Sequence, residues 1–285
     1  MLRVHQSGAP LGAQVEGLDL RTLDDDTFAA VHRAWLDHQV LLFRGQRLTA
    51  ADLIAFSRRL GDLDLAPIQE TGRRFVEGHP ELYVVSNVVE NGAPIGSLGA
   101  GEAVWHTDMS YQAIPPKASI LYAVEVPPCG GNTSFCSMYD AWDRLSVPLK
   151  ERVRAASVKH DGTYNSGGYL REGSIATDDP RAAAGTLHPL VCRHPETGRP
   201  HLYLGRRRLA WLEGLPLDES EALLDELWQA AAEPARAWTH EWTVGDLVLW
   251  DNRCTMHRRD ALDASTRRIL HRTQVKSTAR PVAFA

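Results

Sequence analysis

The first third of the chain shows two patterns of hydrophobic and polar positions. Apolar residues recur at three- and four-residue spacing over residues 24–38, which predicts an amphipathic helix. The run Val40–Phe43 is apolar without interruption, as is typical of a buried strand. A second helix is predicted to begin after Thr49 and to end at Gly61, and a short strand follows at 82–86. This part of the chain therefore has a mixed α/β pattern.

Short apolar segments separated by turns dominate the remainder of the chain, and most of them predict strands. The predicted strands cover residues 118–126, 132–136, 187–193, 201–204, 237–243, 247–250 and 268–275. Helical spacing recurs over residues 138–145, 147–156 and 218–232. Together these patterns predict one mainly β domain over residues 1–285, a β-sandwich or jelly roll with helical cover.

Residues 161–185 follow neither pattern. They are rich in Gly, Ser, Thr, Asp and charged residues. A loop of this length inside a compact domain is usually either functional or disordered. We expect a lid in which Tyr164, Asn165 and Tyr169 close over a site, with disorder unrelated to function as the alternative.

The composition excludes several classes of protein. The chain has 285 residues, a formal net charge of -5 and 24% charged residues, so no basic excess indicates a nucleic-acid partner. The longest apolar stretches are too short to cross a membrane, and the N-terminus lacks the pattern of a signal peptide. The four cysteines form no Cys-x-x-Cys pair, and we expect free thiols in a cytoplasmic protein.

The segment Trp105-His106-Thr107-Asp108 places two metal-binding side chains two positions apart. On an extended strand such residues point to the same side, so both can bind one ion. A second histidine, His257, lies far downstream. Two imidazoles and one carboxylate make the facial triad of non-haem Fe(II) oxygenases. Taken alone, the His-x-Asp spacing is weak evidence, because surface and structural hydrogen-bonded pairs share it.

Two arginines downstream of His257 strengthen the metal hypothesis. Arg268 and Arg272 follow it by 11 and 15 residues, and on an alternating strand both face the same side. An arginine forks onto a carboxylate with two parallel hydrogen bonds. A strand that folds back beside His257 therefore brings a carboxylate-binding group into the metal cavity. The alternative is that both belong to a basic cluster with Arg258 and Arg259 and face water.

Ordered motifs spread over almost the whole chain are the most specific feature of the sequence. They lie at Leu11–Leu20, His38–Gln46, Phe56–Gly61, Trp105–Asp108, Gly130–Thr133, Gly245–Arg253 and the arginine-rich strand that follows. In this order they resemble the taurine dioxygenase and 2,4-dichlorophenoxyacetate dioxygenase family of Fe(II)/2-oxoglutarate enzymes.

The resemblance implies a fold and a reaction. The fold of that family is a double-stranded β-helix, or jelly roll. His106, Asp108 and His257 fall on the iron ligands. Iron would position 2-oxoglutarate and O₂, and decarboxylation to succinate and CO₂ would be coupled to hydroxylation of a substrate C–H bond.

The resemblance also assigns three residues to the co-substrate. Thr133 falls on the threonine that hydrogen-bonds the distal carboxylate of 2-oxoglutarate, and Arg268 falls on the arginine that pairs with it. Arg272 falls on a second arginine, near the co-substrate and the anionic group of the primary substrate.

The substrate is less well defined. Ser86–Val88, Gly131–Cys136 and Glu213–Pro216 resemble the phenoxyacetate enzyme, but Ala66–Gln69 has neither the histidine of the taurine enzyme nor the lysine of the phenoxyacetate enzyme. Gly205–Arg208 also replaces a more neutral stretch. We expect a small anionic substrate, with an aryloxyalkanoate-like carboxylate favoured. A sulfonate, an alkyl sulfate, an amino acid or a natural product is the alternative.

Two other classes of protein share parts of this pattern. A zinc hydrolase also uses two histidines and one carboxylate, but it gives no reason for the pair Arg268 and Arg272. A non-catalytic cupin-like binder would tolerate the loss of a metal ligand, whereas all three are present. We expect a homo-oligomer without a nucleic-acid or membrane partner.

Overall fold

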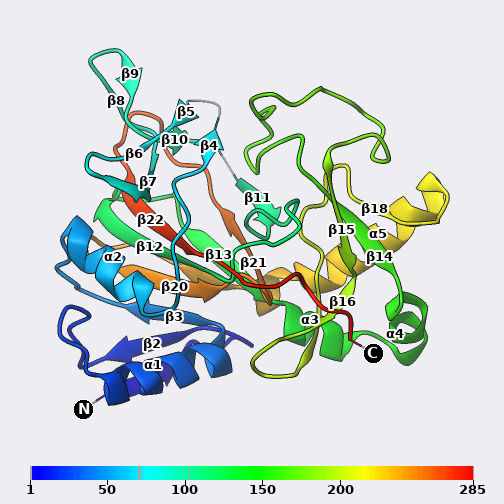
Figure 1. The fold of residues 1–285 in the computed structure, drawn as a ribbon, viewed down its shortest axis with the longest axis horizontal. Coiled ribbons are helices and arrows are strands. Elements are labelled where there is room, and N and C mark those ends of the chain that lie inside the picture. The colour runs from blue at the N-terminus through cyan, green and yellow to red at the C-terminus, as the bar shows by residue number, and fades with distance from the viewer. Residues whose placement is uncertain (1, 70–71, 102, 285) are drawn as a thin grey trace.

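The strands of this computed structural model, which describes residues 2–69, 72–101 and 103–284, form two main sheets (Figure 1). The large sheet has the order β1 (Arg3–Gln6), β2 (Ala13–Glu16), β3 (Val40–Phe43), β20 (Leu247–Asp251), β12 (Ala118–Glu125), β22 (Ile269–Val275), β7 (His79–Ser86) and β10 (Ser97–Leu98), and β6 (Phe75–Val76) also pairs with β7. The small sheet has the order β11 (Ala103–His106), β21 (Thr255–Arg259), β13 (Thr133–Ser137) and β19 (Trp238–His240).

The remaining elements are shorter sheets and the helices. The shorter sheets join β15 (Gly185–Pro189), β14 (Ser157–Asp161) and β18 (Trp211–Leu212), then β16 (Val191–Arg193) with β17 (Pro200–Leu202), β4 (Ile68–Gln69) with β5 (Gly72–Arg73), and β8 (Val89–Glu90) with β9 (Ala93–Pro94). The helices are α1 (Asp25–His38), α2 (Ala50–Arg58), α3 (Met138–Arg144), α4 (Val147–Val153), α5 (Leu217–Ala231) and the 3₁₀ helix η1 (Pro234–Arg236).

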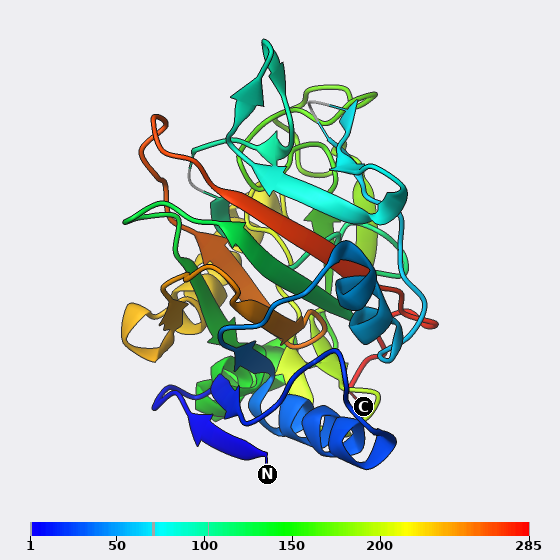
Figure 2. The same cartoon turned by 90° about the vertical axis from the view of Figure 1, so that its left-hand side faces the viewer.

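The middle of the large sheet, at β3 and β20, is buried on both faces. Along β3, Leu41 and Phe43 pack in one hydrophobic cluster with α1 and α2, while Val40 and Leu42 belong to the cluster that includes Phe135 of the small sheet. Successive strand residues point to opposite faces, so an uninterrupted apolar run fits this position. Figure 2 shows β22, β12 and β20 side by side, with α1 and α2 on the near side.

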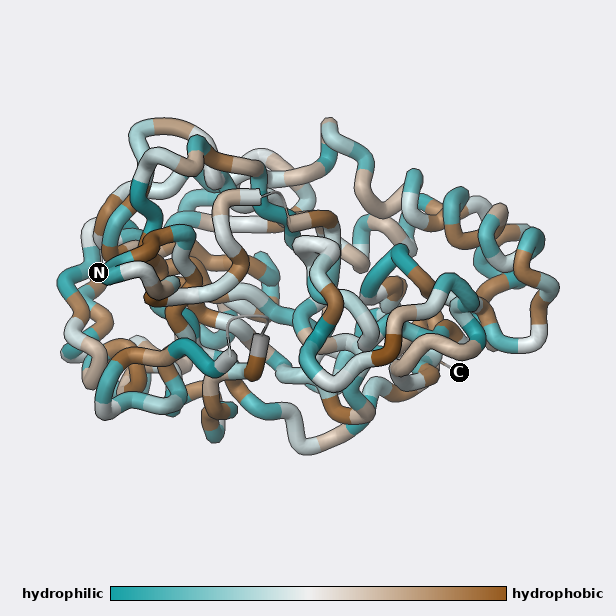
Figure 3. Tube along the Cα trace, turned by 90° about the horizontal axis from the view of Figure 1, so that it is seen from above, coloured by the Kyte–Doolittle hydropathy of each residue, from teal (hydrophilic) through white to brown (hydrophobic). Residues whose placement is uncertain are grey.

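Local signals in the sequence explain where the helices begin. The Asp24 side chain accepts a hydrogen bond from the backbone N–H of Thr27, and Thr49 and Asp52 form a reciprocal capping box at α2. One apolar face of α5 packs in a third cluster with α3 and α4. Figure 3 shows hydrophilic and hydrophobic segments alternating along the chain, and no helix in the described ranges is long and apolar enough to cross a membrane.

The architecture is a mixed, β-rich fold with helical cover, as the sequence predicts. One predicted strand differs: residues 187–193 fall in two strands, because β15 ends at Pro189 and β16 begins at Val191 in another sheet. The apolar spacing continues through Pro189 and Leu190, so it does not reveal the change of sheet, although β15 is mostly exposed or half-buried and β16 buries Val191 and Cys192.

Candidate active site

Three predicted metal ligands meet between the two main sheets. His106 is the last residue of β11, and its pairing partner across the small sheet is His257 in β21. The Oδ1 atom of Asp108 lies 3.7 Å from His106 Nε2 and 3.9 Å from His257 Nε2. One ligand atom from each of the three residues lies within 4.8 Å of the others. This spacing fits one shared metal ion, and two nitrogens with one oxygen are a donor set that suits Fe(II).

Asp108 reaches this position by a route that the sequence did not predict. The strand β11 ends at His106, and the chain turns, with Met109 at φ 49°. Asn252 fixes the turn, because its Oδ1 accepts from the Asp108 N–H at 2.8 Å and its Nδ2 donates to the Asp108 carbonyl at 2.9 Å. The two ligands therefore converge through a turn anchored to the other end of the chain, rather than through one extended strand.

Neighbouring groups orient the ligand atoms. His106 Nδ1 lies 2.7 Å from the Val104 carbonyl, an acceptor that fixes the proton on Nδ1 and leaves Nε2 for a metal. Asp108 Oδ2 accepts from the Ser119 hydroxyl at 2.8 Å. Arg272 Nη1 donates to Asp108 Oδ1 at 3.2 Å. Both of these donors belong to the large sheet, so the carboxylate is held from the side opposite the imidazoles.

Burial and charge set the protonation of the three ligands. Burial lowers the pKa of His106, and burial together with the charge of His106 brings the pKa of His257 well below its ordinary value. Burial alone would raise the pKa of Asp108, but Arg272 and the two imidazoles hold that pKa well below its usual range. Near pH 7 the centre presents two neutral imidazoles and one carboxylate, which are the forms that bind a metal.

Arg268 is a buried cation that forms no ion pair with the residues that the structure describes. Its side chain is 2% exposed, and within the described ranges neither Nε nor Nη2 has a hydrogen-bond partner. Burial and the charge of Arg259 lower the pKa of Arg268 to about 9. Gly131 allows this placement, since a Cβ at that position would lie 3.1 Å from Arg268 Cδ and Nε. A buried unpaired guanidinium is costly, so this place fits an anionic group.

Thr133 lies close to Arg268 through a shared tryptophan. Trp242 Nε1 donates to Thr133 Oγ1 at 3.0 Å, and the Trp242 ring centroid lies 5.9 Å from Arg268 Cζ. Since Oγ1 accepts from the indole, the hydroxyl proton of Thr133 is left to donate to a ligand. In β13, Thr133 and Phe135 pair with Arg259 and His257, so Thr133 is on the same face of the sheet as the metal ligand.

Arg272 lies beside the metal ligands, and its role near the co-substrate and the substrate stays a prediction. Its Nη1 is bonded to the Asp108 carboxylate, and its guanidinium lies over the Tyr83 ring at 4.8 Å. Its Nε is buried and has no protein partner in the described part of the chain. Arg272 therefore contacts a metal ligand through Nη1, while its Nε is left for another group.

Arg206 is a candidate that the sequence reasoning did not assign. It is 7% exposed, it pairs with His106 in an isolated β-bridge, and its Nε has no partner among the described residues. Burial and the charge of Arg171 lower its pKa to about 10. The cationic stretch Gly205–Arg208 was visible in the sequence, but Arg207 and Arg208 have the same charge and are less buried. Only the structure separates the inward arginine from its neighbours.

The predicted lid begins and ends at paired strands. Asp161 of β14 pairs with Gly185 of β15. Between them Tyr164 is half-buried beneath the Arg208 guanidinium, Asn165 is buried, and Tyr169 is 54% exposed. The structure thus places the segment beside the site, and its motion stays a prediction.

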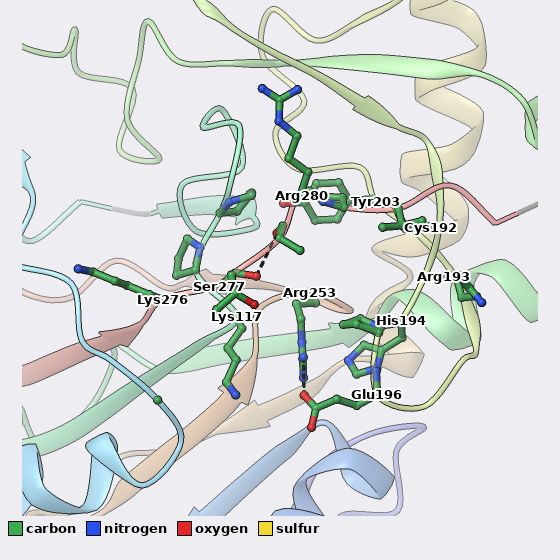
Figure 4. A pocket seen from close by; sticks show the side chains of 18 of the residues that line it. Lys117, Cys192, Arg193, His194, Glu196, Tyr203, Arg253, Lys276, Ser277 and Arg280 are labelled. Carbon is green, nitrogen blue, oxygen red and sulfur yellow. Dashed lines mark hydrogen bonds and ion pairs between the residues drawn. The ribbon is translucent and has the colours of Figure 1, made fainter.

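A second polar cluster lies away from the triad. His194, Asp251 and Cys254 are close enough to share an ion, and His194 borders a cavity of about 620 Å³ that contains none of the triad residues (Figure 4). In Figure 4 Arg253 extends toward Glu196, with which it forms an ion pair of 2.6 Å. This cavity is separate from the metal centre.

Comparison with known proteins agrees with this geometry. The family model described as "Taurine catabolism dioxygenase TauD, TfdA family" matches residues 4–274. The chain is 33% identical to (S)-phenoxypropionate/alpha-ketoglutarate-dioxygenase of Delftia acidovorans, over 94% of this chain and 93% of that protein. It is 36% identical to the alpha-ketoglutarate-dependent 2,4-dichlorophenoxyacetate dioxygenase of Cupriavidus pinatubonensis, over 91% of this chain and 92% of the relative.

A solved structure extends the match to three dimensions. The structure of AAD-2 in complex with Mn(II) and N-oxalylglycine has a TM-score of 0.79 and 31% identity, and the match covers 99% of this chain and 100% of that one. A β-rich fold around two imidazoles and one carboxylate is typical of a non-haem iron oxygenase. The chain belongs to the TauD/TfdA family of Fe(II)/2-oxoglutarate-dependent dioxygenases.

Proposed function

We propose that this dioxygenase hydroxylates a small organic anion, with an aryloxyalkanoate-like carboxylate as the favoured class. One oxygen atom of O₂ would enter a substrate C–H bond, and the other would enter succinate as 2-oxoglutarate loses CO₂. The observation that carries the proposal is Arg206, a buried cation whose Nε has no hydrogen-bond partner in the described ranges and whose backbone forms a β-bridge with the metal ligand His106. Such a group favours a substrate with a complementary charge.

In this proposal each residue has a defined task. His106, Asp108 and His257 would hold Fe(II), which when bound supplies the redox chemistry that couples decarboxylation to hydroxylation. Thr133 and Arg268 would hold the distal carboxylate of 2-oxoglutarate with a hydrogen bond and an ion pair. Their supports are the available hydroxyl proton and the unpaired Nε and Nη2 of the arginine.

The substrate class rests on two supports. The two relatives compared above act, by their names, on (S)-phenoxypropionate and 2,4-dichlorophenoxyacetate, which are carboxylates on aromatic bodies. On this chain, Tyr111 lies beside Arg206, with 5.9 Å from Arg206 Cζ to the ring centroid. An aromatic ring next to a cation suits a ligand that combines an apolar body with an anionic group.

The finer description of the fold belongs to the same proposal. A single domain with a double-stranded β-helix accounts for two facing sheets with the ligands between them. Residues 161–185 would form the lid, because both ends of the segment are fixed in paired strands beside the site.

Sulfonates, alkyl sulfates, amino acids and natural products stay as alternative substrates for the same chemistry. A sulfonate or sulfate would use Arg206 in the same way as a carboxylate. A zinc hydrolase or a cupin-like binder would leave the buried Arg268 without a role, so both fit this structure less well.

The test is a substrate panel with Fe(II), 2-oxoglutarate and O₂, scored by succinate released only when substrate is added. The panel contains (S)-2-phenoxypropionate, 2,4-dichlorophenoxyacetate, taurine, dodecyl sulfate, an amino acid and the neutral 2-phenoxyethanol. We expect an aryloxyalkanoate to give the highest kcat/KM. Arg206→Gln should raise the KM of that anion about tenfold or more, since a charge-assisted contact is lost.

The matched control is Arg207→Gln. Arg207 is the next residue in the chain, but its guanidinium pairs with Glu221 and Asp225, each at 2.6 Å. This variant should keep the wild-type KM. Equal stimulation by neutral 2-phenoxyethanol, or an unchanged KM in Arg206→Gln, would refute the anion assignment and leave the family assignment intact.

A further inference from the structure

One arginine of the predicted lid lies over Tyr111, an aromatic residue three positions after the metal ligand Asp108. The Cζ atom of Arg171 lies 4.4 Å from the centroid of the Tyr111 ring, and Arg206 Cζ lies 5.9 Å from the same centroid. In the described part of the chain, the Nε of each arginine is buried and has no hydrogen-bond partner. Two guanidiniums from distant parts of the sequence thus flank one aromatic ring.

The position of Tyr111 ties this group to the metal centre. It follows Asp108 by three residues, at the end of the turn that carries that ligand. Gly162, at the start of the lid, packs directly on Tyr111, because a Cβ there would lie 3.2 Å from Tyr111 Cβ and Cδ2. The backbone N–H of Arg171 donates to the Thr163 carbonyl at 2.9 Å, so the lid is folded back on its own base.

Carboxylates near the two arginines are already occupied. Asp161 Oδ1 accepts from the Thr163 N–H at 2.7 Å, and Asp161 Oδ2 accepts from the Tyr164 N–H at 3.3 Å. Asp108 is held by Arg272 and Ser119. Burial and the like charge of Arg171 lower the pKa of Arg206, while the charges of Asp108 and Asp161 act in the opposite direction. Two like charges held together in a buried place fit a site that receives an anion.

We infer that Arg171 and Arg206 bind the anionic group of the primary substrate between them, so that the charge of the substrate holds the lid closed. The inference rests on the proposed function and names a specificity-determining residue for it. A carboxylate or a sulfonate has the two or more oxygens needed to accept from both guanidiniums. Arg206 comes from the body of the protein and Arg171 from the lid, so a neutral molecule would bind without joining the two.

The same segment offers a matched control. Arg181 is also in the lid, but its guanidinium is largely exposed and pairs with Asp179 at 3.0 Å. Replacement of either arginine by glutamine removes one positive charge from the lid. Of these two arginines, Arg171 is the one that lies over Tyr111. A comparison of the two variants therefore separates a local contact from the general charge of the segment.

The experiment measures binding in protein loaded with Mn(II) and N-oxalylglycine, so that no turnover occurs. Calorimetric titrations with (S)-2-phenoxypropionate, 2,4-dichlorophenoxyacetate, benzenesulfonate and neutral 2-phenoxyethanol give Kd for wild type, Arg171→Gln, Arg171→Lys and Arg181→Gln. We expect Arg171→Gln to raise the Kd of the preferred anion about 10- to 100-fold, from the loss of one charge-assisted contact. Arg171→Lys should fall between wild type and Arg171→Gln.

Three further readings separate this contact from a structural effect. The Kd of 2-phenoxyethanol, the Kd of N-oxalylglycine and the thermal midpoint should stay at wild-type values in Arg171→Gln. If wild type prefers anions and Arg171→Gln binds them as Arg181→Gln does, the inference fails and the proposed function stands. If wild type binds no probe anion more tightly than 2-phenoxyethanol, the proposed substrate class and the inference fail together.

Discussion

Two clusters of histidine and carboxylate in this protein have the spacing of a metal site, yet their surroundings differ. His106, Asp108 and His257 lie between the main sheets, and His194, Asp251 and Cys254 lie beside the cavity of Figure 4. Both sets are buried. Distance and burial alone therefore do not distinguish them.

The hydrogen-bond partners distinguish the second cluster. His194 Nε2 donates to Asp251 Oδ2 at 3.0 Å, and its Nδ1 accepts from the backbone N–H of Thr197 at 3.1 Å. Arg253 donates to both oxygens of Asp251, at 2.8 and 2.6 Å. The ring nitrogens of His194 and the carboxylate oxygens of Asp251 all have protein partners, so a metal would have to displace existing bonds.

Around the triad, several buried polar atoms lack a hydrogen-bond partner among the described residues. Among the described residues, His257 Nδ1 and the Nε atoms of Arg206, Arg268 and Arg272 are buried without partners. Buried polar groups are nearly always hydrogen-bonded, so a concentration of exceptions indicates a place that small molecules occupy. Buried polar atoms without hydrogen-bond partners therefore identify a functional site in this protein better than the spacing of the metal-binding residues does.

The largest expected effect separates the clusters directly. Asp108→Ala should reduce iron binding and abolish 2-oxoglutarate-dependent turnover, because one of three protein ligands is lost. Metal content and succinate release measure the two effects. Wild-type decarboxylation of 2-oxoglutarate by this variant would show that the triad is assigned wrongly.

The corresponding change in the second cluster should act on stability. Asp251→Ala leaves the buried Arg253 without its main counterion, and loss of one partner of a buried pair costs about 3–5 kcal/mol in the free energy of unfolding. Urea unfolding measures this loss, with Glu16→Gln, at an exposed pair with His5, as the control. A variant of normal stability that lost its iron would mean that the second cluster, and not the first, holds the metal.

Removal of the co-substrate cation should weaken binding to a similar or smaller degree. Arg268→Ala should cost about 2–5 kcal/mol in 2-oxoglutarate binding, because a charge-assisted contact is lost. The control is Arg267→Gln, since the adjacent Arg267 is exposed and pairs with Glu125. The KM for 2-oxoglutarate at saturating substrate measures the difference, and equal values for the two variants would rule out the assigned role of Arg268.

The smallest expected effect is a change in motion. Amide hydrogen exchange over residues 161–185 should slow when a substrate anion binds, and exchange around His194 should not change. Mass spectrometry with and without substrate provides the comparison. Equal exchange of the lid in both states, with bound ligand confirmed, would contradict a lid function.

The sequence predicted much of the fold because local signals and burial agree in it. The capping residues Asp24 and Thr49 and the apolar run of β3 all lie where the pattern placed them. The break between β15 and β16 was missed, since the apolar spacing continues across it although the two strands belong to different sheets.

At the candidate site, local sequence patterns predict the residues better than they predict the geometry that joins them. The motifs indicated His106 and Asp108 correctly, but the strand geometry used to join them was wrong, because a turn fixed by Asn252 brings Asp108 into place. Arg206 and Arg171 carry no signal in the sequence that separates them from Arg207 or Arg181. Which arginine faces inward depends on contacts between segments far apart in the chain, and no local pattern contains that information.

The position of Asp108 couples metal binding to the stability of the fold. The carboxylate is bonded to Ser119 and Arg272 of the large sheet and faces two histidines of the small sheet. A metal bound by all three ligands is therefore a cross-link between the two layers, and it binds only the folded chain. By linkage, each tenfold rise in the concentration of free metal above its dissociation constant adds about 1.4 kcal/mol to the free energy of unfolding. The melting temperature would then report how much of a preparation carries its metal.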